Sequence, residues 1–338
     1  MKFQKNVNLA KYTSFHVGGS AQYFGMVRNR EDLREAFKFA RRKNLKVLVL
    51  GGGSNTLLPD KKLARLVLKI AIRGLKFYRT AGRTFVYAGS GKNWDLVVAE
   101  AVKKNLGGIE NLSLIPGTVG GAIYQNIGAY GAEMKNVLES VEVFDLETGK
   151  IKILSNKACQ FAYRNSIFQS KAGRNLVILG AVLRLNRYIE PNLKYPDLAS
   201  YFDGKKNVAI EEIRRAVIEI RKSKLIYPTK NIGTAGSFFK NPIVIKPRYS
   251  ELKNKFPDIK ASAIGSGHLK LSAGQLIEKA GWKGSRLANV GVSDKHALVL
   301  VSYRNAKAKE IVSLAKKIQA SVKNKFGIKL KPEVRIIT

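Results

Sequence analysis

Residues 112–131 read LSLIPGTVGGAIYQNIGAYG and contain five glycines and no charged side chain, in a chain whose residues are 25% charged. Glycines adopt positive φ angles and let main-chain N–H groups approach a ligand closely, so such a stretch can bind anionic oxygens without a lysine. A membrane span is the alternative for an uncharged run, but Pro116, Gln125 and Asn126 leave it too polar and broken for a lipid-facing helix. The stretch therefore predicts an anion-binding cradle.

A second glycine-rich turn lies earlier in the chain. The β-branched run KVLVL at residues 46–50 ends in GGGSN at residues 51–55, a strand-to-turn junction whose amides and small side chains can receive a phosphate. Alone, the turn is weak evidence, because about half of such turns are purely structural. Two cradles in one chain are stronger evidence for an anionic ligand.

Length and composition limit what surrounds these cradles. With 338 residues and 45% hydrophobic content, the chain can bury a sizeable core and form two or three domains. We expect a cytoplasmic protein without membrane insertion, because the start has no apolar signal region and no run approaches eighteen apolar residues. Cys159 is the only cysteine and there are three histidines, so neither an internal disulfide nor a clustered metal site is expected.

The charge is strongly unbalanced, with 61 Lys and Arg against 24 Asp and Glu and a formal net charge of +37. Such a balance favours polyanionic partners. The cations occur in almost every segment rather than in one tail or stripe, and no RNA-binding or helix-turn-helix motif accompanies them. A generally basic, solvated surface is the favoured interpretation, and specific nucleic-acid binding is the alternative.

The apolar periodicity predicts helices at residues 31–42 and 94–104 and strands at residues 46–50, 85–88, 137–143 and 176–185. From about residue 208 the pattern changes to helices, at residues 210–224 and 307–326, with one clear strand at residues 297–302 between them. This change predicts a separate domain. The tail at residues 329–337 is extended, because Pro332 keeps the preceding residue out of a helix.

Ser237 lies in GTAGSFFKN, after a turn of small residues and before two aromatics. A serine here can simply cap a turn, which is the more common role, or it can donate a proton. No histidine is nearby in the sequence and there is no G-x-S-x-G motif, so an acyl-transfer nucleophile and an ordinary hydrolase are disfavoured.

Two further charged residues have an unusual setting. Arg164 lies in the aromatic and apolar frame YRNSIF, where it can be a partly buried ion-pair member or can bind a carboxylate or enolate oxygen. Glu333 lies in PEVRII next to Arg335, where a plain salt bridge is the simpler interpretation. Sequence spacing alone does not bring Ser237, Arg164 and Glu333 together.

The motifs LGGGSN, IPGTVGGAIYQNIGAYG, FAYRNSIF, GTAGSFFKNP, HALVLV and KPEVRII together resemble the UDP-N-acetylenolpyruvoylglucosamine reductases, also called UDP-N-acetylmuramate dehydrogenases, in their longer-loop subclass. The resemblance runs in order from about Thr13 to the C-terminus. It implies an α+β protein with an FAD-binding fold of the vanillyl-alcohol oxidase and cresol methylhydroxylase (PCMH) type in two subdomains. Residues 1–70 and 71–205 would form these subdomains, with the strand at 330–338 returning to the first, and residues 206–329 an α+β substrate-binding domain.

The resemblance also implies an NADPH-dependent flavoenzyme of peptidoglycan synthesis. The FAD is expected to be noncovalent, because the first cradle has no histidine and His16 is remote in sequence. The residues that the resemblance assigns to cofactor binding are Gly51, Gly52, Gly53, Ser54, Asn55, Pro116, Gly117, Thr118, Gly120, Gly121, Asn126, Gly128 and Arg221.

The implied reaction is the reduction of UDP-N-acetylglucosamine enolpyruvate to UDP-N-acetylmuramate. Ser237 would donate the proton, and Arg164 and Glu333 would stabilise the enolic intermediate. The residues expected to bind the UDP-sugar or NADPH are Tyr195, Lys224, Asn241 and His296. A monomer without a specific nucleic-acid partner is expected.

The chain departs from the family pattern at two positions. Ser262 stands where the longer-loop subclass usually has a tyrosine, and His296 stands where some members have glutamine. Two alternative functions stay open at this point. One is a basic nucleic-acid-binding protein on a flavin-type scaffold, and the other is a flavin oxidase of another substrate class.

Overall fold

The computed structural model describes residues 1–187, 190, 192–205 and 207–338 of the chain. Its helices are α1 Arg30–Arg42, α2 Trp94–Lys103, α3 Val119–Gln125, α4 Pro196–Phe202, α5 Ile210–Lys224, α6 Lys246–Lys255, α7 Ala273–Lys279 and α8 Ala308–Phe326. Its strands are β1 Gln4–Asn8, β2 Ser20–Val27, β3 Val47–Leu50, β4 Thr56–Leu57, β5 Leu63–Ile70, β6 Leu75–Thr80, β7 Arg83–Gly89, β8 Gly128–Ala129, β9 Ala132–Glu133, β10 Leu138–Asp145, β11 Ile151–Ser155, β12 Leu176–Leu185, β13 Ile232–Ser237, β14 Ile243–Ile245, β15 Ala261–Ala263, β16 His268–Leu271, β17 Arg286–Leu287, β18 Val290–Val292, β19 Val299–Tyr303 and β20 Arg335–Ile336.

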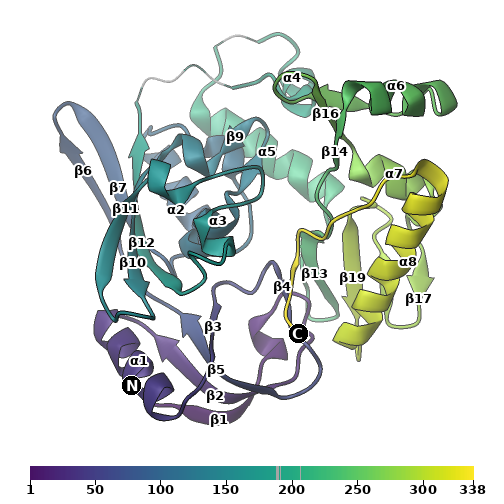
Figure 1. Cartoon of the computed structure of the whole chain (residues 1–338). Helices are drawn as coiled ribbons and strands as arrows, with labels where there is room; N and C mark the ends of the chain where they lie inside the picture. The colour runs from purple at the N-terminus through teal and green to yellow at the C-terminus, as the bar shows by residue number, and fades with distance from the viewer. Residues whose placement is uncertain (188–189, 191, 206) are drawn as a thin grey trace. The chain divides into compact units, whose positions relative to one another are not determined.

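The chain forms two compact units (Figure 1). The first unit consists of Met1–Val7, Ala21–Gly53 and Leu63–Arg221, and the second of Asn8–Ser20, Ser54–Lys62 and Lys222–Thr338. Each unit therefore contains segments that are distant in sequence. The division into three domains with the boundaries given above stays a prediction.

The first unit contains a four-stranded sheet in the order β1-β2-β5-β3, in which β2, β5 and β3 run parallel. Helix α1 covers it, because its buried residues Leu33, Ala36 and Ala40 recur at helical spacing and share a core with Leu66 and Leu68. The Asn29 side chain accepts a hydrogen bond from Asp32 N and so begins the helix. The first turn of α1 contains Glu31 and Asp32 and its last turn contains Arg41 and Arg42, as the helix dipole favours.

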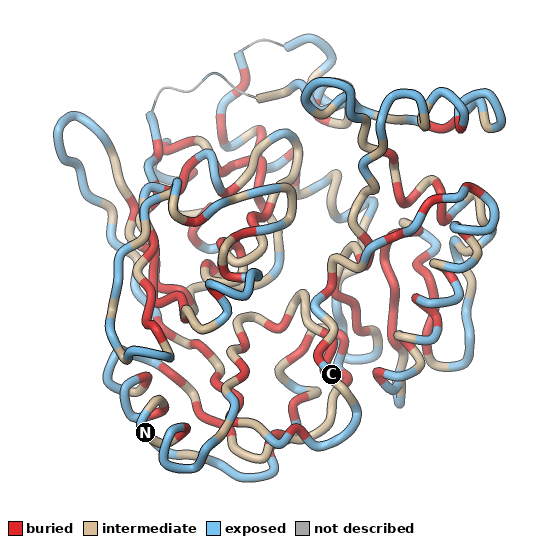
Figure 2. The backbone as a smooth tube through the Cα atoms, in the orientation of Figure 1, coloured by how far each residue is buried: buried red, intermediate tan, exposed pale blue. Residues whose placement is uncertain are grey.

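A second sheet of the first unit is antiparallel, in the order β11-β10-β12-β7-β6. Its buried side chains share one core with those of α2 and α3, including Trp94, Val97 and Ile123. Figure 2 shows that buried positions run along β10, β12 and these helices, whereas the β6–β7 turn is exposed. The glycine-rich stretch thus contains a short helix, α3, that is packed on a rigid sheet.

The second unit has a sheet in the order β13-β19-β18-β17, whose apolar residues share a core with those of α7 and α8. The Asp60 carboxylate accepts hydrogen bonds from Ala308 N at 2.7 Å and Lys309 N at 3.0 Å, which satisfies amides at the start of α8. A small antiparallel sheet, β14-β16-β15, contains Ser262 in β15, where it pairs with Lys270. The C-terminal strand β20 pairs in parallel with β4.

The long periodic elements match the sequence expectations within a few residues, as α1, α2, α5, α8 and β12 show. The predicted strands at residues 85–88 and 137–143 lie in β7 and β10, and the strand expected at 297–302 is found at Val299–Tyr303. The region between α5 and α8 differs from the expectation of a single strand, because it also contains β13 to β18. None of the helices in the described part of the chain has the length and apolar composition to cross a membrane.

Candidate functional site

The two predicted cradles meet in the first unit. A Cβ atom added at Gly52 would lie 2.7 Å from Gly117 Cα, and one added at Gly51 would lie 3.1 Å from Thr118 Oγ1. The loops therefore approach backbone to backbone, which only glycine allows at Gly52. Gly117 has a φ of +118°, a conformation that L side chains rarely adopt. The sequence predicts two cradles for one anionic ligand, and the structure brings their loops together.

Two buried hydroxyls lie beside these loops. Thr118 Oγ1 and Ser90 Oγ are buried and have no hydrogen-bond partner among the described residues. Gly120 lies against Ser90, since an added Cβ would be 3.0 Å from Ser90 Cβ. Buried polar atoms normally have a partner, so these hydroxyls fit a ligand that supplies acceptor oxygens. The residues present therefore fit the diphosphate of FAD.

Lys69 places a positive charge at the same loops. It lies on β5, and its Nζ donates a hydrogen bond to the Gly51 carbonyl oxygen. Burial lowers the pKa of the Lys69 ammonium. No carboxylate of the described residues forms an ion pair with it. An anionic ligand next to Gly51 would supply the missing counter-charge.

The start of α2 holds the loop around Gly117 in place. Trp94 N donates to Gly117 O at 3.1 Å, and Trp94 Nε1 donates to Leu112 O at 2.9 Å. On the same side, Val119 N donates to Lys92 O at 3.0 Å and Gly120 N to Ser90 O at 2.9 Å. These bonds fix the loop before any ligand binds. The exposed Pro116 begins its turn.

A third group of predicted residues forms around Arg164. Its Nη2 donates to Gly128 O at 2.5 Å, and a Cβ at Gly128 would lie 2.8 Å from Arg164 Nη1. Asn126 is fully buried, and its side chain bonds to Ala162 O, Glu133 Oε2 and Lys135 N. The structure thus gives Gly128 and Asn126 contacts that position Arg164 and its loop. Arg164 itself has a φ of +52°, a strained conformation of the kind that clusters at functional sites.

Tyr195 lies at the start of α4 and is 44% exposed. Its ring packs edge-on against Tyr130, with 5.1 Å between the centroids. Tyr130 belongs to the long glycine-rich stretch and has a φ of +48°. The Asn111 side chain ties the two segments by donating to Tyr130 O at 2.7 Å and Asn192 O at 2.9 Å.

The predicted proton donor and the predicted acid come together in the second unit. Ser237 ends β13 after Gly236, which has a φ of +70°. The next residue, Phe238, is fully buried, and its carbonyl oxygen accepts a hydrogen bond from Glu333 N at 2.8 Å. Glu333 therefore lies beside the residue that follows Ser237, although 96 positions separate the serine and the acid in the sequence.

Asn55, the last residue of the GGGSN turn, contacts Glu333. Asn55, which follows Ser54 at the start of a segment of the second unit, donates from Nδ2 to Glu333 O at 3.1 Å. The Asn55 carbonyl oxygen accepts from Arg335 N at 3.0 Å. The predicted role of Asn55 in FAD binding stays a prediction, and its observed contacts hold the C-terminal strand.

His296 and Asn241 lie around α7. An added Cβ at Gly274 would be 3.1 Å from His296 Cε1, and Asn241 Oδ1 accepts from Ala273 N at 3.0 Å. Burial and the charges of Lys224 and Lys283 lower the pKa of His296, against a smaller raising effect of Glu278. These effects favour the neutral form of His296, and Lys224 is close enough for its charge to act on the ring.

Arg221 lies near the end of α5 in the first unit. Its Nε is buried and has no hydrogen-bond partner among the described residues. A buried guanidinium nitrogen without a partner fits an anionic ligand.

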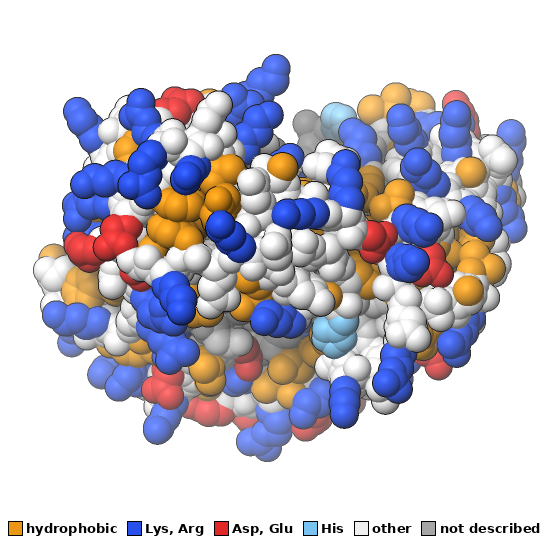
Figure 3. Space-filling model, turned by 90° about the horizontal axis from the view of Figure 1, so that it is seen from below, with side chains coloured by type: hydrophobic (Ala, Val, Ile, Leu, Met, Phe, Trp, Pro, Cys, Tyr) orange, Lys and Arg blue, Asp and Glu red, His pale blue; other side chains and the backbone are white. Residues whose placement is uncertain are grey.

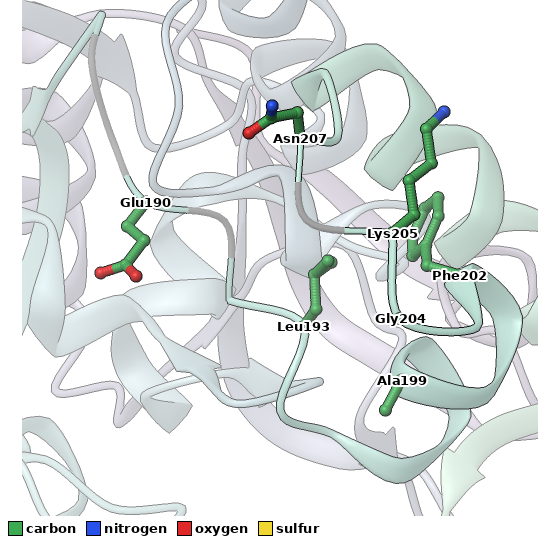
Figure 4. Close-up of a pocket in the computed structure, with 7 residues that line it drawn as sticks. All are labelled: Glu190, Leu193, Ala199, Phe202, Gly204, Lys205 and Asn207. Atoms are coloured by element: carbon green, nitrogen blue, oxygen red, sulfur yellow. The ribbon is translucent and has the colours of Figure 1, made fainter.

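One pocket of about 470 Å³ lies near α4 (Figure 4). It is lined by Glu190, Leu193, Ala199, Phe202, Gly204, Lys205 and Asn207. None of these residues was singled out by the sequence, and the cofactor and substrate proposals do not use this pocket.

Sequence reasoning missed Ser90, Lys69, Asp95 and Arg214. Lys69 had a recognisable pattern, since it is the only charged residue in the second half of the apolar strand β5. Asp95 and Arg214 have no local pattern, because their partners are distant in sequence, and Ser90 has none because the glycine loop beside it lies 30 positions away. No cluster of three or more His, Cys, Asp or Glu residues that could hold a metal ion occurs in the described ranges.

Comparisons with known proteins complete the description. Residues 227–337 match the family model of the UDP-N-acetylenolpyruvoylglucosamine reductase C-terminal domain, and residues 21–155 match that of an FAD binding domain. A UDP-N-acetylenolpyruvoylglucosamine reductase of Amoebophilus asiaticus is 40% identical over 340 residues, which cover 100% of both chains.

Two solved structures are also similar. The UDP-N-acetylenolpyruvylglucosamine reductase of Thermus caldophilus covers 100% of both chains with 27% identity and a TM-score of 0.69. A VAO-type flavoprotein of Myceliophthora thermophila C1 matches 90% of this chain and 70% of its own length, at 14% identity and a TM-score of 0.50. These matches confirm the predicted fold class and the predicted FAD cofactor.

Proposed function

The chain belongs to the UDP-N-acetylenolpyruvoylglucosamine reductase family and is an FAD-dependent oxidoreductase, and from this premise we propose that it reduces UDP-N-acetylglucosamine enolpyruvate to UDP-N-acetylmuramate with NADPH. This reaction serves peptidoglycan synthesis. The FAD would be held noncovalently by the joined glycine loops, with Thr118 and Ser90 as hydrogen-bond donors and Lys69 as a nearby cation.

The observation that carries the proposal is the placement of Ser237 and Glu333. The chain pairs the two segments through Glu333 N and Phe238 O, and an isolated bridge joins Phe239 to Pro332. Neither a structural serine nor a surface salt bridge requires this pairing. A hydroxyl and a carboxyl group on adjoining backbone supply a proton donor and a group that can stabilise charge next to it.

The chemistry assigns a role to each residue. FAD, held by the joined glycine loops with Thr118 and Ser90, would supply the hydride chemistry between NADPH and the enolpyruvyl double bond. Negative charge then develops on the neighbouring carbon and its carboxylate, which Arg164 stabilises as a planar cation and Glu333 as a hydrogen-bonding group. Ser237 donates its hydroxyl proton to that carbon.

The ligand-binding roles follow the same division. Lys224 is a cation suited to a diphosphate, and His296, Asn241 and Tyr195 provide polar or aromatic contacts for the UDP-sugar or NADPH. A cytoplasmic monomer that takes no specific nucleic acid is part of the proposal, and size-exclusion chromatography with light scattering tests the oligomeric state.

The decisive experiment separates the two half-reactions of a Ser237→Ala variant by stopped-flow absorbance. Removal of the hydroxyl leaves the NADPH step nearly unchanged, because that step needs no proton from Ser237. It slows oxidation of the reduced flavin by the enolpyruvyl sugar nucleotide by roughly a hundredfold or more, the usual size of a general-acid contribution.

The matched control is Ser313→Ala, which removes an exposed hydroxyl on α8. It should leave both half-reactions unchanged. Equal slowing of both steps in Ser237→Ala would refute the assigned role. Flavin reduction by NADPH followed by turnover with oxygen but not with the sugar nucleotide would instead favour a flavin oxidase of another substrate class.

A further inference from the structure

Three parts of the first unit meet at the Asp95 carboxylate. Asp95 Oδ1 accepts from Arg214 Nη1 at 2.7 Å, and Oδ2 accepts from Arg214 Nη2 at 3.0 Å. Oδ1 also accepts from Leu114 N at 2.5 Å. Asp95 lies in the first turn of α2 and Arg214 on α5, whereas Leu114 lies two residues before Pro116. The Asp95 side chain thus links α2 and α5 to the glycine-rich stretch at residues 112–131.

The backbone at Leu114 needs such support. Leu114 has a φ of +57°, in the left-handed region that residues with a Cβ rarely adopt. Strained backbone of this kind persists only where its surroundings hold it. The hydrogen bond from Leu114 N to Asp95 fixes the chain at the residue where it turns toward Pro116 and Gly117.

The ion pair is charged and largely shielded from solvent. Arg214 is 17% exposed and Asp95 is 24% exposed. Burial raises the pKa of the Asp95 carboxyl, but the hydrogen bonds from Arg214 and Leu114 and the charges of Arg214 and Arg221 outweigh it, so the pKa is lowered. Two parallel N–H···O bonds between charged groups also fix the relative orientation of their helices.

Arg221 shares a face of α5 with Arg214, because seven residues are nearly two full turns. Its charge acts on Asp95, and its buried Nε has no hydrogen-bond partner within the described ranges. Residues such as Ile213, Ala216 and Val217 pack α5 against a separate apolar cluster. The Asp95–Arg214 pair therefore fixes the rotation of α5 that places Arg221.

We propose that Asp95 and Arg214 are positioning residues of the FAD site, which hold the turn before Pro116 and the Arg221 face of α5 in the arrangement that binds the anionic part of the cofactor. This inference rests on the proposed function. Neither residue needs to touch FAD, and the pair contributes by reducing the reorganisation that binding would otherwise require.

The test compares Asp95→Asn and Arg214→Lys with the unchanged chain. Each holoenzyme is diluted, and the dissociation constant of FAD is measured from the fluorescence of released flavin. Asp95→Asn removes the charge and turns one acceptor into a donor that faces Arg214, so the dissociation constant should rise about tenfold. Arg214→Lys keeps the charge but loses the fork, and should raise the constant roughly threefold.

Glu212→Gln is the matched control. It breaks the ion pair at 2.8 Å between Glu212, on the same helix, and Lys205, which precedes that helix, and should change FAD affinity by less than about twofold. Unfolding of every variant is followed by circular dichroism, to separate affinity at 20 °C from loss of the fold. If the Asp95→Asn variant is less heat-stable than the unchanged chain but has the same dissociation constant for FAD, the inference is overturned.

The double variant adds a test that does not depend on one substitution. If the two residues act as a unit, Asp95→Asn with Arg214→Lys weakens FAD binding no more than Asp95→Asn alone. Full additivity would contradict the proposal. Should Asp95→Asn fail to fold, the Arg214→Lys result alone decides. If the unchanged chain binds no FAD, the proposed function is refuted. If the unchanged chain binds FAD and the variants bind it equally tightly, only the inference is refuted.

Discussion

At His296, one backbone hydrogen bond decides which ring nitrogen can serve a ligand. Leu298 N donates to Nδ1 at 3.2 Å, so the neutral ring carries its proton on Nε2. The side chain then offers a hydrogen-bond donor, as a glutamine amide at this position also would. A histidine at this position therefore supplies a donor that glutamine would also supply, and in addition it responds to pH.

The lowered pKa of His296 predicts how stability changes with pH. Because the folded pKa lies below the usual 6.5, the unfolded chain takes up a proton first as the pH falls, and this residue lowers the free energy of unfolding below about pH 6.5. His296→Gln should therefore lose less thermal stability than the unchanged chain between about pH 7 and about pH 5.5. His268→Gln, at an exposed position, is the control, and an equal loss in all three proteins would contradict the prediction.

Individual residue types could be predicted, but their partnerships could not. Ser237, Arg164 and Glu333 stand in unusual local settings that the sequence displays. Their contacts depend on pairings such as Phe238 with Glu333 or Arg164 with Gly128, which join distant segments. Asp95 and Arg214 lie 119 positions apart and have no local motif, so only the fold reveals them.

At the scale of elements, the two-residue strand β20 fixes the segment that carries Glu333 through its pairing with β4. Arg335→Pro removes the N–H that binds Asn55 O at 3.0 Å, so we expect it to lower the free energy of unfolding by about 1–3 kcal/mol. The second half-reaction should also slow, because Glu333 is displaced. Urea unfolding and stopped-flow absorbance measure the two effects.

Arg335→Ala is the control for that substitution, because it keeps the N–H and alters only an exposed side chain. If both variants lose the same stability, the strand pairing is not the cause. The same strand explains a limit of sequence prediction. Helices such as α8 show their own periodicity, whereas two-residue strands such as β4 and β20 exist only through a partner 279 positions away.

Over the whole molecule, the net charge of +37 is spread rather than gathered. Figure 3 shows Lys and Arg side chains scattered over the visible face, with acidic and apolar side chains between them. The chain should therefore bind double-stranded DNA of any sequence weakly, and raising the salt concentration from about 50 mM to about 200 mM should abolish that binding.

A gel-shift series with two unrelated DNA sequences at several salt concentrations measures this. FAD content should stay constant through the series. A marked preference for one sequence that survives at high salt would support the nucleic-acid alternative. The sequence predicts both the amount of positive charge and its spread over the surface, because lysines and arginines occur in almost every segment.

The position of Glu333, 96 residues after Ser237, has a consequence for biosynthesis. Translation proceeds from the N-terminus, so Ser237 and its strand are made well before the acid that joins them. The pairing of Glu333 with Phe238 cannot form until the codon of Glu333 has been read. A ribosome that terminates before that codon would release a flavoprotein whose glycine-rich loops are complete and whose proton-transfer half is unfinished.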